Sequence, residues 1–486
     1  MNFRTIRGVA RNAAILGSAW FLFAPLGAAQ TSLSSLTREF VKVDAPFVAL
    51  KHVRVIDGTG AAPLEDQTIL LERNRISAIG KAATMAVPAG SQVLDLTGRT
   101  VIPGLVGMHD HLFYPSGVRG GEYLVNELGF TAPRLYLACG VTTIRTTGSV
   151  EPYTDMSLKR AIDAGQIPGP KIHLTAPFLQ GPGSSTPLFY ELRSPDDARE
   201  MVRFWANQGA TSFKAYTDIT RAQLAAAIEE AHRLGLKVTG HLCSVGFREA
   251  AELGIDNLEH GLVVDSEFVK DKAPDVCPPG KAVSDSIVNL DIQGAPAQDM
   301  IRTLVKKNVA VTSTLAVFES FVPGRPPLQK RIVDALLPQA LTDYLLARER
   351  TAANPGTNAI QFRKGMEFER AFSKAGGLLL AGVDPTGYGG VLPGFGDQRE
   401  VELLVEAGFT SVEAIQIATS NGAAWLGESD RIGTLAAGKQ ADVVVLRGDP
   451  SKNISDIENV ELVFKDGVGY DSAKLIESVR GEVGLH

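Results

Sequence analysis

The stretch that decides the fold is Val101-Ile-Pro-Gly-Leu-Val-Gly-Met-His-Asp-His111. Its apolar residues predict a short buried strand that ends in two histidines, His109 and His111. Residues two apart in a strand point to the same face, so both imidazoles can reach one metal ion while Asp110 points away. Imidazole pairs suit zinc or a similar metal. The stretch therefore predicts a metal site whose other ligands lie further along the chain.

Strand and helix patterns alternate through the middle of the chain. The helical pattern over residues 220–234 is the clearest, because Thr220 and Gln223 form a capping-box pair at its start and Gly235 follows its end. The strand candidates are Leu105–His111, Val141–Thr146, Lys171–Ala176, Ser212–Tyr216, Lys237–Leu242, Asn257–Gly261, Ala310–Leu315 and Leu378–Asp384. Eightfold alternation favours an α/β protein with a (β/α)8 barrel of the TIM type, here over residues 104–432.

The barrel prediction can be checked against the sequence, because the active site of such a barrel lies at the carboxyl ends of its strands. Candidate metal ligands should therefore fall at strand ends. They do so on five of the eight strands: His109 and His111 on the first, Lys214 on the fourth, His241 on the fifth, His260 on the sixth and Asp384 on the eighth. We expect these side chains to face one site.

Short strands flank the predicted barrel on both sides. Residues 46–103 include a hairpin pattern over Thr68–Gly80 with Arg73 and Asn74 at its tip, and residues 433–486 contain two more strand patterns. Neither segment is large enough to bury much core alone. We therefore expect them to join in one composite β-sandwich, preceded by a linker over residues 30–45.

The first 29 residues differ from the rest in composition. Three arginines precede an apolar run from Ala13 to Leu26, and small residues follow it. This order is typical of a secretory signal peptide cleaved after Ala29, and it predicts a secreted or periplasmic protein without stable membrane association. A single N-terminal membrane anchor stays open as the alternative, although the run is shorter than the roughly 20 residues that a span needs.

Composition narrows the range of partners. The net charge is −6 and no basic run occurs, so nucleic acid is not an expected partner, whereas a homo-oligomer stays open. The three cysteines, Cys139, Cys243 and Cys277, exclude a disulfide scaffold. They allow one bridge, whose pairing the sequence does not reveal.

Several motifs after residue 46 resemble those of a known family. They are Val55-Ile-Asp-Gly-Thr-Gly60, the opening stretch Val101–His111, Ala250-Ala-Glu-Leu-Gly-Ile-Asp-Asn-Leu-Glu-His-Gly261, Ala418-Thr-Ser-Asn-Gly-Ala-Ala-Trp-Leu-Gly427 and Ala441-Asp-Val-Val-Val-Leu446. Together they resemble the metal-dependent amidohydrolase superfamily, and within it the branch of imidazolonepropionase-like proteins and Xaa-Pro dipeptidases.

The resemblance implies a role for each candidate ligand. It assigns His109, His111 and Asp384 to one divalent ion, His241 and His260 to a second, and an N-carboxylated Lys214 to a bridging position between them. Zinc is the expected metal. A bridging hydroxide would attack the substrate carbonyl, and Asp384 would pass the hydroxide proton to the leaving nitrogen. An unmodified Lys214 ammonium would be repelled by the ions, so the alternative is a single-metal site or a buried Lys214 paired with Asp384 or Glu259.

The chain departs from the branch pattern at two places. Branch members usually have Arg-Asp at the end of the second strand, where this chain has Arg145 followed by Thr146, so any role of that acid is absent. Pro385 directly follows Asp384 and is expected to reshape the adjoining loop. Neither departure removes a predicted metal ligand.

Substrate contacts are predicted for four further residues. A tyrosine near the fourth strand of related dipeptidases is thought to meet the substrate carboxylate, and Tyr216 lies two residues after Lys214. Arg145, Tyr114 and Arg119 are the other candidates for that contact. Structural pairing or solvent exposure is the alternative for each of them.

The sequence thus predicts an exported binuclear hydrolase that cleaves the amide bond of a dipeptide or an N-acyl amino acid. Hydrolysis of a cyclic amide, imide or lactone, or deamination, would use the same strand-end ligands and stays open. A non-catalytic scaffold on this fold is a third hypothesis, which the presence of all the ligands disfavours.

Overall fold

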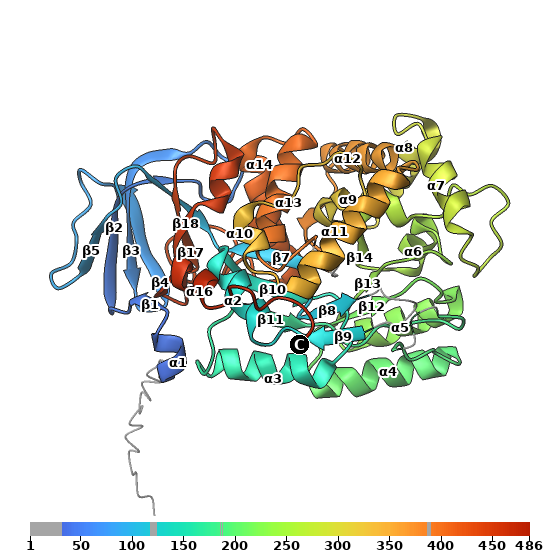
Figure 1. The fold of residues 1–486 in the computed structure, drawn as a ribbon, viewed down its shortest axis with the longest axis horizontal. Coiled ribbons are helices and arrows are strands. Elements are labelled where there is room, and N and C mark those ends of the chain that lie inside the picture. Colours follow the sequence, from blue (N-terminus) through green and yellow to red (C-terminus); the bar gives the residue numbers. More distant parts are fainter. Residues whose placement is uncertain (1–31, 117–123, 185, 187, 386–389) are drawn as a thin grey trace, which may run out of the picture. The chain divides into compact units, whose positions relative to one another are not determined.

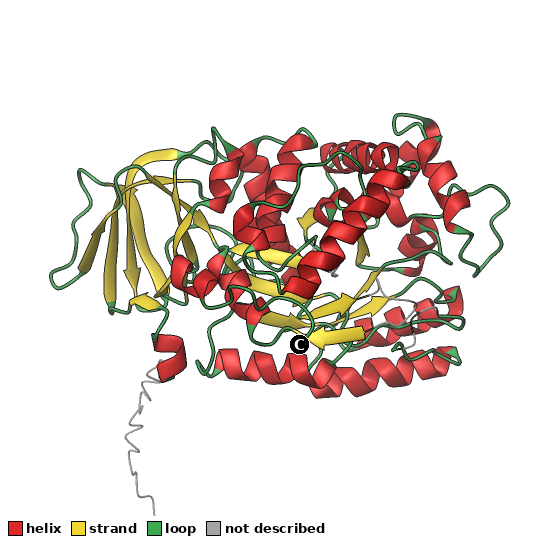
Figure 2. Ribbon diagram, in the orientation of Figure 1, coloured by secondary structure: helices red, strands yellow, loops and turns green. Residues whose placement is uncertain are grey.

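The structure is a computed structural model, and it describes residues 32–116, 124–184, 186, 188–385 and 390–486. The predicted signal peptide and Arg119 lie outside the described residues. Figure 1 follows the chain by colour, and Figure 2 separates its helices from its strands. Within the described part of the chain, no helix is both long and apolar enough to cross a lipid bilayer.

Strands from both ends of the chain share one sheet, in which blue and red strands meet in Figure 1. Its order is β1-β19-β18-β17-β6-β2-β3-β4, and β5 pairs with β2. The strands are β1 (Val41–Val43), β2 (Phe47–Val55), β3 (Leu64–Glu72), β4 (Arg75–Lys81), β5 (Gln92–Asp95), β6 (Arg99–Pro103), β17 (Val443–Arg447), β18 (Val460–Lys465) and β19 (Val468–Asp471). The two chain ends join at two antiparallel pairs, β6 with β17 and β1 with β19.

Apolar side chains of this sheet explain why the two chain ends need each other. Val53 and Val101 from the N-terminal part pack in one buried cluster with Val443 and Phe464 from the C-terminal part. All four side chains are fully buried, so separating the segments would expose their apolar surface to water. The predicted hairpin is also confirmed, since β3 and β4 pair antiparallel with Glu72 opposite Arg75.

The middle of the chain contains two sheets of parallel strands. They form a sheet of order β11-β10-β7 and a second one of order β12-β13-β14-β15-β16. Their bounds are β7 (Leu105–Asp110), β10 (Val141–Thr146), β11 (Lys171–Leu174), β12 (Ser212–Ala215), β13 (Lys237–Gly240), β14 (Asn257–Glu259), β15 (Ala310–Ser313) and β16 (Leu379–Ala381). A parallel bridge between Thr175 and Ser212 links the first sheet to the second. On the other side, the amides of Val383 and Asp384 donate to the carbonyl of His109 at 3.0 and 2.8 Å.

All eight predicted barrel strands are therefore present. β10 has the predicted bounds, and each of the others ends one to three residues earlier than expected. At β14 and β16 the predicted ends were wrong because the ligand-bearing residues belong to turns. His260 and Asp384 have φ values of 69° and 50°, which ladder pairing does not allow.

The helices flank the strands, and those from α2 to α12 lie between parallel strands in the sequence. They are α1 (Ser35–Arg38), α2 (Thr131–Ala138), α3 (Pro152–Asp163), α4 (Pro195–Gln208), α5 (Arg221–Arg233), α6 (Phe247–Leu253), α7 (Gly280–Val288), α8 (Ala295–Lys306), α9 (Leu315–Glu319), α10 (Lys330–Val333), α11 (Pro338–Ala353), α12 (Asn358–Lys374), α13 (Phe395–Glu406), α14 (Ser411–Gln416), α15 (Gly422–Leu426) and α16 (Ser472–Glu477). Helix α5 shows the predicted capping box between Thr220 and Gln223. Its apolar stripe faces the core, since Leu224, Ile228 and Ala231 are buried. A short hairpin of β8 (Phe113–Ser116) and β9 (Leu124–Glu127) follows β7.

Candidate metal centre

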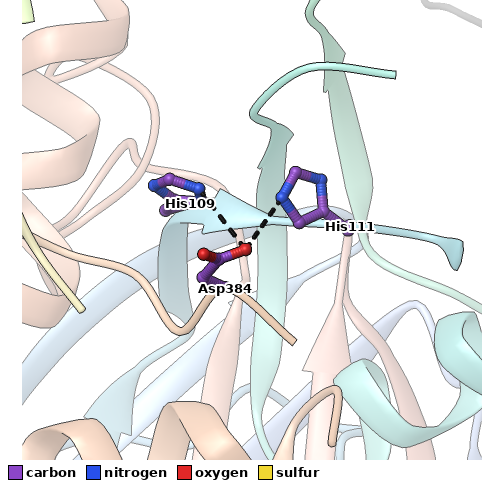
Figure 3. Close-up of side chains that lie close together, drawn as sticks. All are labelled: His109, His111 and Asp384. Atoms are coloured by element: carbon purple, nitrogen blue, oxygen red, sulfur yellow. Dashed lines mark ion pairs between the residues drawn. The ribbon is translucent and has the colours of Figure 1, made fainter. Parts of the chain in front are cut away.

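Two imidazoles and one carboxylate converge where β7 ends. His111 Nε2 lies 3.1 Å from Asp384 Oδ1, and His109 Nε2 lies 3.7 Å from the same oxygen. One ligand atom from each of these residues lies within 4.8 Å of the others. Figure 3 shows both rings, carried by the end of β7, directed at the Asp384 carboxylate. The structure thus brings these three predicted ligands together, and their role in binding a metal ion stays a prediction.

The backbone after β16 explains how Asp384 reaches this position. A Cβ on Gly382 would lie 2.3 Å from the Cβ of His109, so only glycine lets the two chains approach this closely. The hydrogen bonds from Val383 and Asp384 to the His109 carbonyl then fix the turn. Asp384 itself adopts φ of 50°, a conformation that costs a non-glycine residue free energy and concentrates at functional sites.

His260, His241 and Lys214 lie beside this group. His260 Nε2 is 3.8 Å from Asp384 Oδ2, and its ring centroid is 4.4 Å from that of His241. Lys214 Nζ is 3.0 Å from His109 Nε2. The structure thus brings together all six side chains that the sequence analysis selected as ligands.

The Nδ1 atoms of three of the histidines have partners on the protein. His111 Nδ1 lies 3.2 Å from the carbonyl of Gly148, and His260 Nδ1 lies 2.8 Å from Thr314 Oγ1. His109 Nδ1 lies 2.8 Å from Glu259 Oε2. When Nδ1 is engaged in this way, Nε2 is the nitrogen left to bind an ion.

Burial controls the charge of the cluster. Desolvation, reinforced by the nearby Lys214 cation, lowers the pKa of His109 to about 4 and that of His241 to about 3. Burial likewise lowers the pKa of Lys214 to about 8, although Asp384 and Glu259 oppose this shift. For Asp384, burial acts to raise the pKa, but the adjacent histidines outweigh it and hold the pKa well below its usual range. Neutral imidazoles around an ionised carboxylate are the protonation states that metal binding requires.

The donor set fits a divalent ion of the zinc type. His260 Nε2 is buried without a hydrogen-bond partner among the described residues, although an orphaned buried nitrogen is costly. An ion placed among the nitrogens and Asp384 would satisfy it. Nitrogen and carboxylate ligands of this kind are those that zinc takes in catalytic sites.

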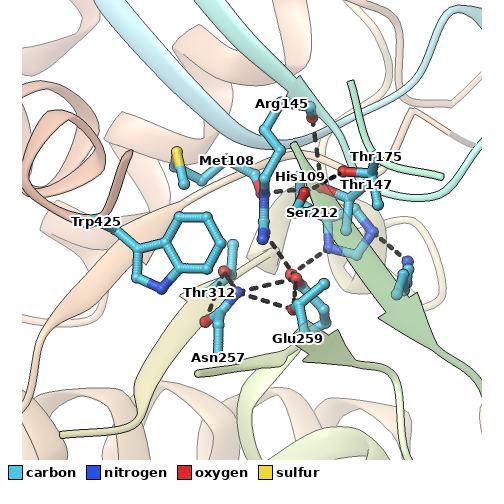
Figure 4. A network of polar contacts seen from close by, with 12 residues as sticks. Met108, His109, Arg145, Thr147, Thr175, Ser212, Asn257, Glu259, Thr312 and Trp425 are labelled. Carbon is cyan, nitrogen blue, oxygen red and sulfur yellow. Dashed lines mark hydrogen bonds and ion pairs between the residues drawn. The ribbon is translucent and has the colours of Figure 1, made fainter. Parts of the chain in front are cut away.

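A polar layer that the sequence analysis did not predict lies directly below the ligands. Its centre is Glu259, whose Oε2 contacts His109 and whose Oε1 lies 2.7 Å from Arg145 Nη2. Asn257 and Thr239 also donate to Oε1. Figure 4 shows this network, in which Glu259 and Asn257 from β14 meet His109 from β7 and Arg145 from β10. The signal available in the sequence was an acidic residue at the end of the strand Asn257–Glu259, directly before the predicted ligand His260.

Comparison with known proteins agrees with this geometry. The sequence profile described as "Amidohydrolase family" matches residues 100–468, which include every predicted metal ligand. The chain belongs to the amidohydrolase family.

Individual curated relatives match only part of this amidohydrolase. An imidazolonepropionase of Mycolicibacterium smegmatis is 35% identical over 107 residues, which is 22% of this chain and 25% of the relative. The chain spans about a quarter of the length of the curated relatives that it matches first.

Solved structures match over most of the chain. The crystal structure of a candidate prolidase from Bifidobacterium longum is 26% identical and has a TM-score of 0.64, covering 89% of this chain and 98% of that one. A Xaa-Pro dipeptidase with methionine bound in its active site has a TM-score of 0.66 at 22% identity, covering 87% of this chain and 100% of that one. The second match is a likeness of fold.

The predicted substrate residues lie in different surroundings. The ring of Tyr216 is 4.9 Å from that of His241, so it borders the ligand cluster. Tyr114 is buried on β8. Arg145 is fully buried, and its guanidinium donates to the Met108 carbonyl and to Glu259, which are the contacts of structural pairing.

An aromatic wall of Phe178, Phe189 and Tyr216 stands next to the ligands. The rings of Phe178 and Phe189 stack at 4.3 Å, and both meet Tyr216 edge-on at 5.0 and 5.1 Å. Lys214 Nζ lies 5.3 Å from the centre of the Phe178 ring. The wall gives one side of the amidohydrolase site an apolar surface.

A disulfide joins Cys243 to Cys277. Cys243 lies two residues after His241, and the bridge spans 34 residues of sequence. It ties the segment after β14 to the loop that carries His241. Cys139 is free and buried.

Proposed function

We propose that this amidohydrolase is a metal-dependent hydrolase that cleaves the amide bond of a dipeptide or an N-acyl amino acid. The observation that carries the proposal is the convergence of His109, His111 and Asp384, with ligand atoms within 4.8 Å of one another. The overall likeness to a candidate prolidase at 26% identity supports the choice of substrate class.

Two divalent ions are proposed, with zinc preferred. His109, His111 and Asp384 would hold one, and His241 and His260 the other. Lys214 would bridge them as its carbamate, because an ammonium 3.0 Å from a ligand nitrogen would repel the cations whereas a carbamate would attract them. When bound, the ions lower the pKa of a water molecule to about 7 and polarise the substrate carbonyl.

The chain's own residues supply the remaining steps. Asp384 Oδ1 accepts the proton of the attacking water and delivers it to the leaving nitrogen, because this oxygen faces the Nε2 atoms of both His109 and His111. The aromatic wall excludes water from one side of the site. Tyr216 borders the cluster, and we propose that it helps to orient the substrate.

The proposal extends to architecture and location. We infer that the eight parallel strands close into one (β/α)8 barrel over residues 104–432, with residues 46–103 and 433–486 as a composite β-sandwich. We also infer export after cleavage of residues 1–29, which the disulfide supports because disulfides persist mainly in oxidising compartments. N-terminal sequencing of the mature protein tests export, and a sequence that begins at Met1 would refute it.

The test of function is a substrate panel. Zinc-loaded protein would be incubated with dipeptides, including Xaa-Pro dipeptides, and with N-acyl amino acids, and the released amine would be measured. We expect turnover of at least one class. If the metal-loaded protein released amine from none of them, the proposed substrate class would be wrong.

A second candidate, hydrolysis of a cyclic amide, rests on a specific observation. The 35% identity to an imidazolonepropionase is higher than the identity to either prolidase-type structure, although it covers only 107 residues. Hydantoins and lactams added to the same panel separate the two, because a ring-opening enzyme would act on these and leave linear dipeptides intact.

A further inference from the structure

We propose that Glu259, held by Arg145, is a positioning residue that sets the tautomer of His109 and thereby the affinity of the site for its first metal ion. The inference rests on the proposed metal centre, and it concerns a layer of side chains one step below the ligands. The three side chains involved, His109, Arg145 and Glu259, are fully buried.

The first step is the donor pattern at Glu259 Oε1. This oxygen lies 2.7 Å from Arg145 Nη2 and 2.9 Å from Asn257 Nδ2. Thr239 Oγ1 is also within hydrogen-bond distance of it. Guanidinium and amide nitrogens only donate hydrogen bonds, so Oε1 must accept. Oε1 therefore carries no proton, and Oε2 is the oxygen that faces the imidazole.

The second step concerns His109. Its Nδ1 lies 2.8 Å from Glu259 Oε2. A carboxylate beside an arginine is ionised and accepts hydrogen bonds, so Nδ1 must carry the proton. Nε2 is then the unprotonated nitrogen, and it is the atom that points toward Asp384 Oδ1. The carboxylate thus leaves His109 in the tautomer that can bind an ion through Nε2.

The third step concerns Arg145. Its Nε donates to the carbonyl of Met108 at 2.9 Å, and Nη2 contacts the same oxygen as well as Glu259. One planar guanidinium therefore holds both the peptide group that precedes His109 and the carboxylate that contacts its ring. The guanidinium carbon also lies over the Trp425 ring, 4.6 Å from the ring centre. Figure 4 shows Arg145 between Met108, Trp425 and Glu259.

The geometry makes the substitution Glu259→Gln informative. An amide whose oxygen faces Arg145, Asn257 and Thr239 must turn its NH2 toward His109 Nδ1. Nδ1 would then have to accept, which moves the ring proton to Nε2 and blocks ion binding. The opposite orientation would place the NH2 against three donors. Glu259→Asp keeps the charge and removes one methylene, so it preserves the tautomer while lengthening the contact.

The experiment measures the affinity of the metal-free protein for Zn²⁺ by competition with a chromophoric chelator. We expect Glu259→Gln to weaken binding of the first ion by about 10–100-fold, the range typical of outer partners of metal-bound histidines. Glu259→Asp should recover part of the loss. The matched control is Glu400→Gln, which also neutralises a fully buried glutamate but one that contacts Ser313 and Ala316 rather than a ligand. The control should bind Zn²⁺ as the wild type does.

The outcomes separate this inference from the proposed function. A wild-type protein that binds no Zn²⁺ overturns the metal centre itself. Wild-type binding together with equal binding by Glu259→Gln overturns only the positioning role.

A second measurement covers the case in which Glu259→Gln does not fold. In the metal-free wild type labelled with ¹⁵N-histidine, the NMR signal that disappears in His109→Gln should report a proton on Nδ1. A proton on Nε2 of His109 would overturn the inference.

Discussion

Two groups of buried polar side chains lie near the ends of neighbouring parallel strands, and they differ in what they can hold. The ligand cluster around His109, His111 and Asp384 combines imidazole nitrogens with a single carboxylate. The second group, here called the acid cluster, consists of Ser313 at the end of β15, Glu369 on α12 and Glu400 on α13. It contains no nitrogen ligand.

The acid cluster is stabilised by a proton on one of its carboxyl groups, whereas the ligand cluster would be stabilised by a metal cation. Ser313 Oγ lies 2.9 Å from Glu369 Oε2 and 2.6 Å from Glu400 Oε1. A hydroxyl has one proton to donate, so one of the two carboxyl groups must be protonated and donate in return. Burial raises the pKa of Glu400 to about 7 and that of Glu369 well above its usual range. Burial of acids alone therefore does not mark a metal site, and the converging unprotonated nitrogens do.

Asp384→Asn tests the chemical side of this comparison and should have the largest effect. An amide can still coordinate an ion weakly but cannot accept and return a proton, so metal should stay bound while turnover falls by about 10²- to 10⁴-fold. Turnover is measured with the substrate found in the panel, and bound metal by elemental analysis. Near wild-type turnover in this variant would contradict the proton-transfer role of Asp384.

His260→Ala tests whether the site holds two ions. His260 Nε2 is a buried ligand nitrogen without a hydrogen-bond partner among the described residues, so its loss should remove the second ion and leave the group of His109, His111 and Asp384 able to bind the first. Elemental analysis should give one ion per chain in the variant and two in the wild type. Equal metal content in both proteins would argue for a single-metal site.

Glu400→Gln tests the acid cluster, and the expected effect is on stability rather than on metal. The Glu400 pKa is raised from 4.5 to about 7 in the folded protein. The folded state therefore binds the proton more tightly than the unfolded state, and wild-type stability falls as pH rises from about 4.5 to 7. Glutamine does not ionise, so the variant should gain up to about 3 kcal/mol relative to the wild type between pH 4.5 and pH 8.

Urea unfolding at the two pH values measures this difference. Glu367→Gln is the control, because Glu367 lies on the same helix as Glu369 but its side chain is 53% exposed. A stability difference between Glu400→Gln and the wild type that did not change with pH would mean that Glu400 is ionised throughout.

Strand-end placement of the ligands was predictable from sequence because it follows from local patterns. Apolar runs predicted the eight strands, and the residue type at each end predicted His109, His241 and Asp384 as ligands. The polar layer was not predictable in this way. Glu259 contacts His109 across 150 residues of sequence and Arg145 across 114, and no local pattern encodes such pairs.

The contacts of Arg145 were likewise not predictable from its local sequence. Its position at the end of the second strand suggested a substrate contact, since strand ends face the site. Its side chain instead contacts the carbonyl of Met108 and the ring of Trp425. A long flexible side chain can reach above or below its own Cα, so the strand position alone did not determine its partner. The Cys243–Cys277 bridge was open for a similar reason, because three cysteines allow several pairings.

Ser313→Ala is the smallest change that separates the two clusters. Removing the hydroxyl leaves two buried carboxyl groups without their shared partner, which should lower the free energy of unfolding by about 1–3 kcal/mol. Zinc affinity and turnover should stay at wild-type values, because the Ser313 hydroxyl contacts Glu369 and Glu400 and not His109, His111 or Asp384. Urea unfolding and zinc competition on the same preparation measure both quantities. If the variant lost zinc affinity in proportion to its stability, the two clusters would be one coupled unit, and the acid cluster would have to be counted among the supports of the metal centre.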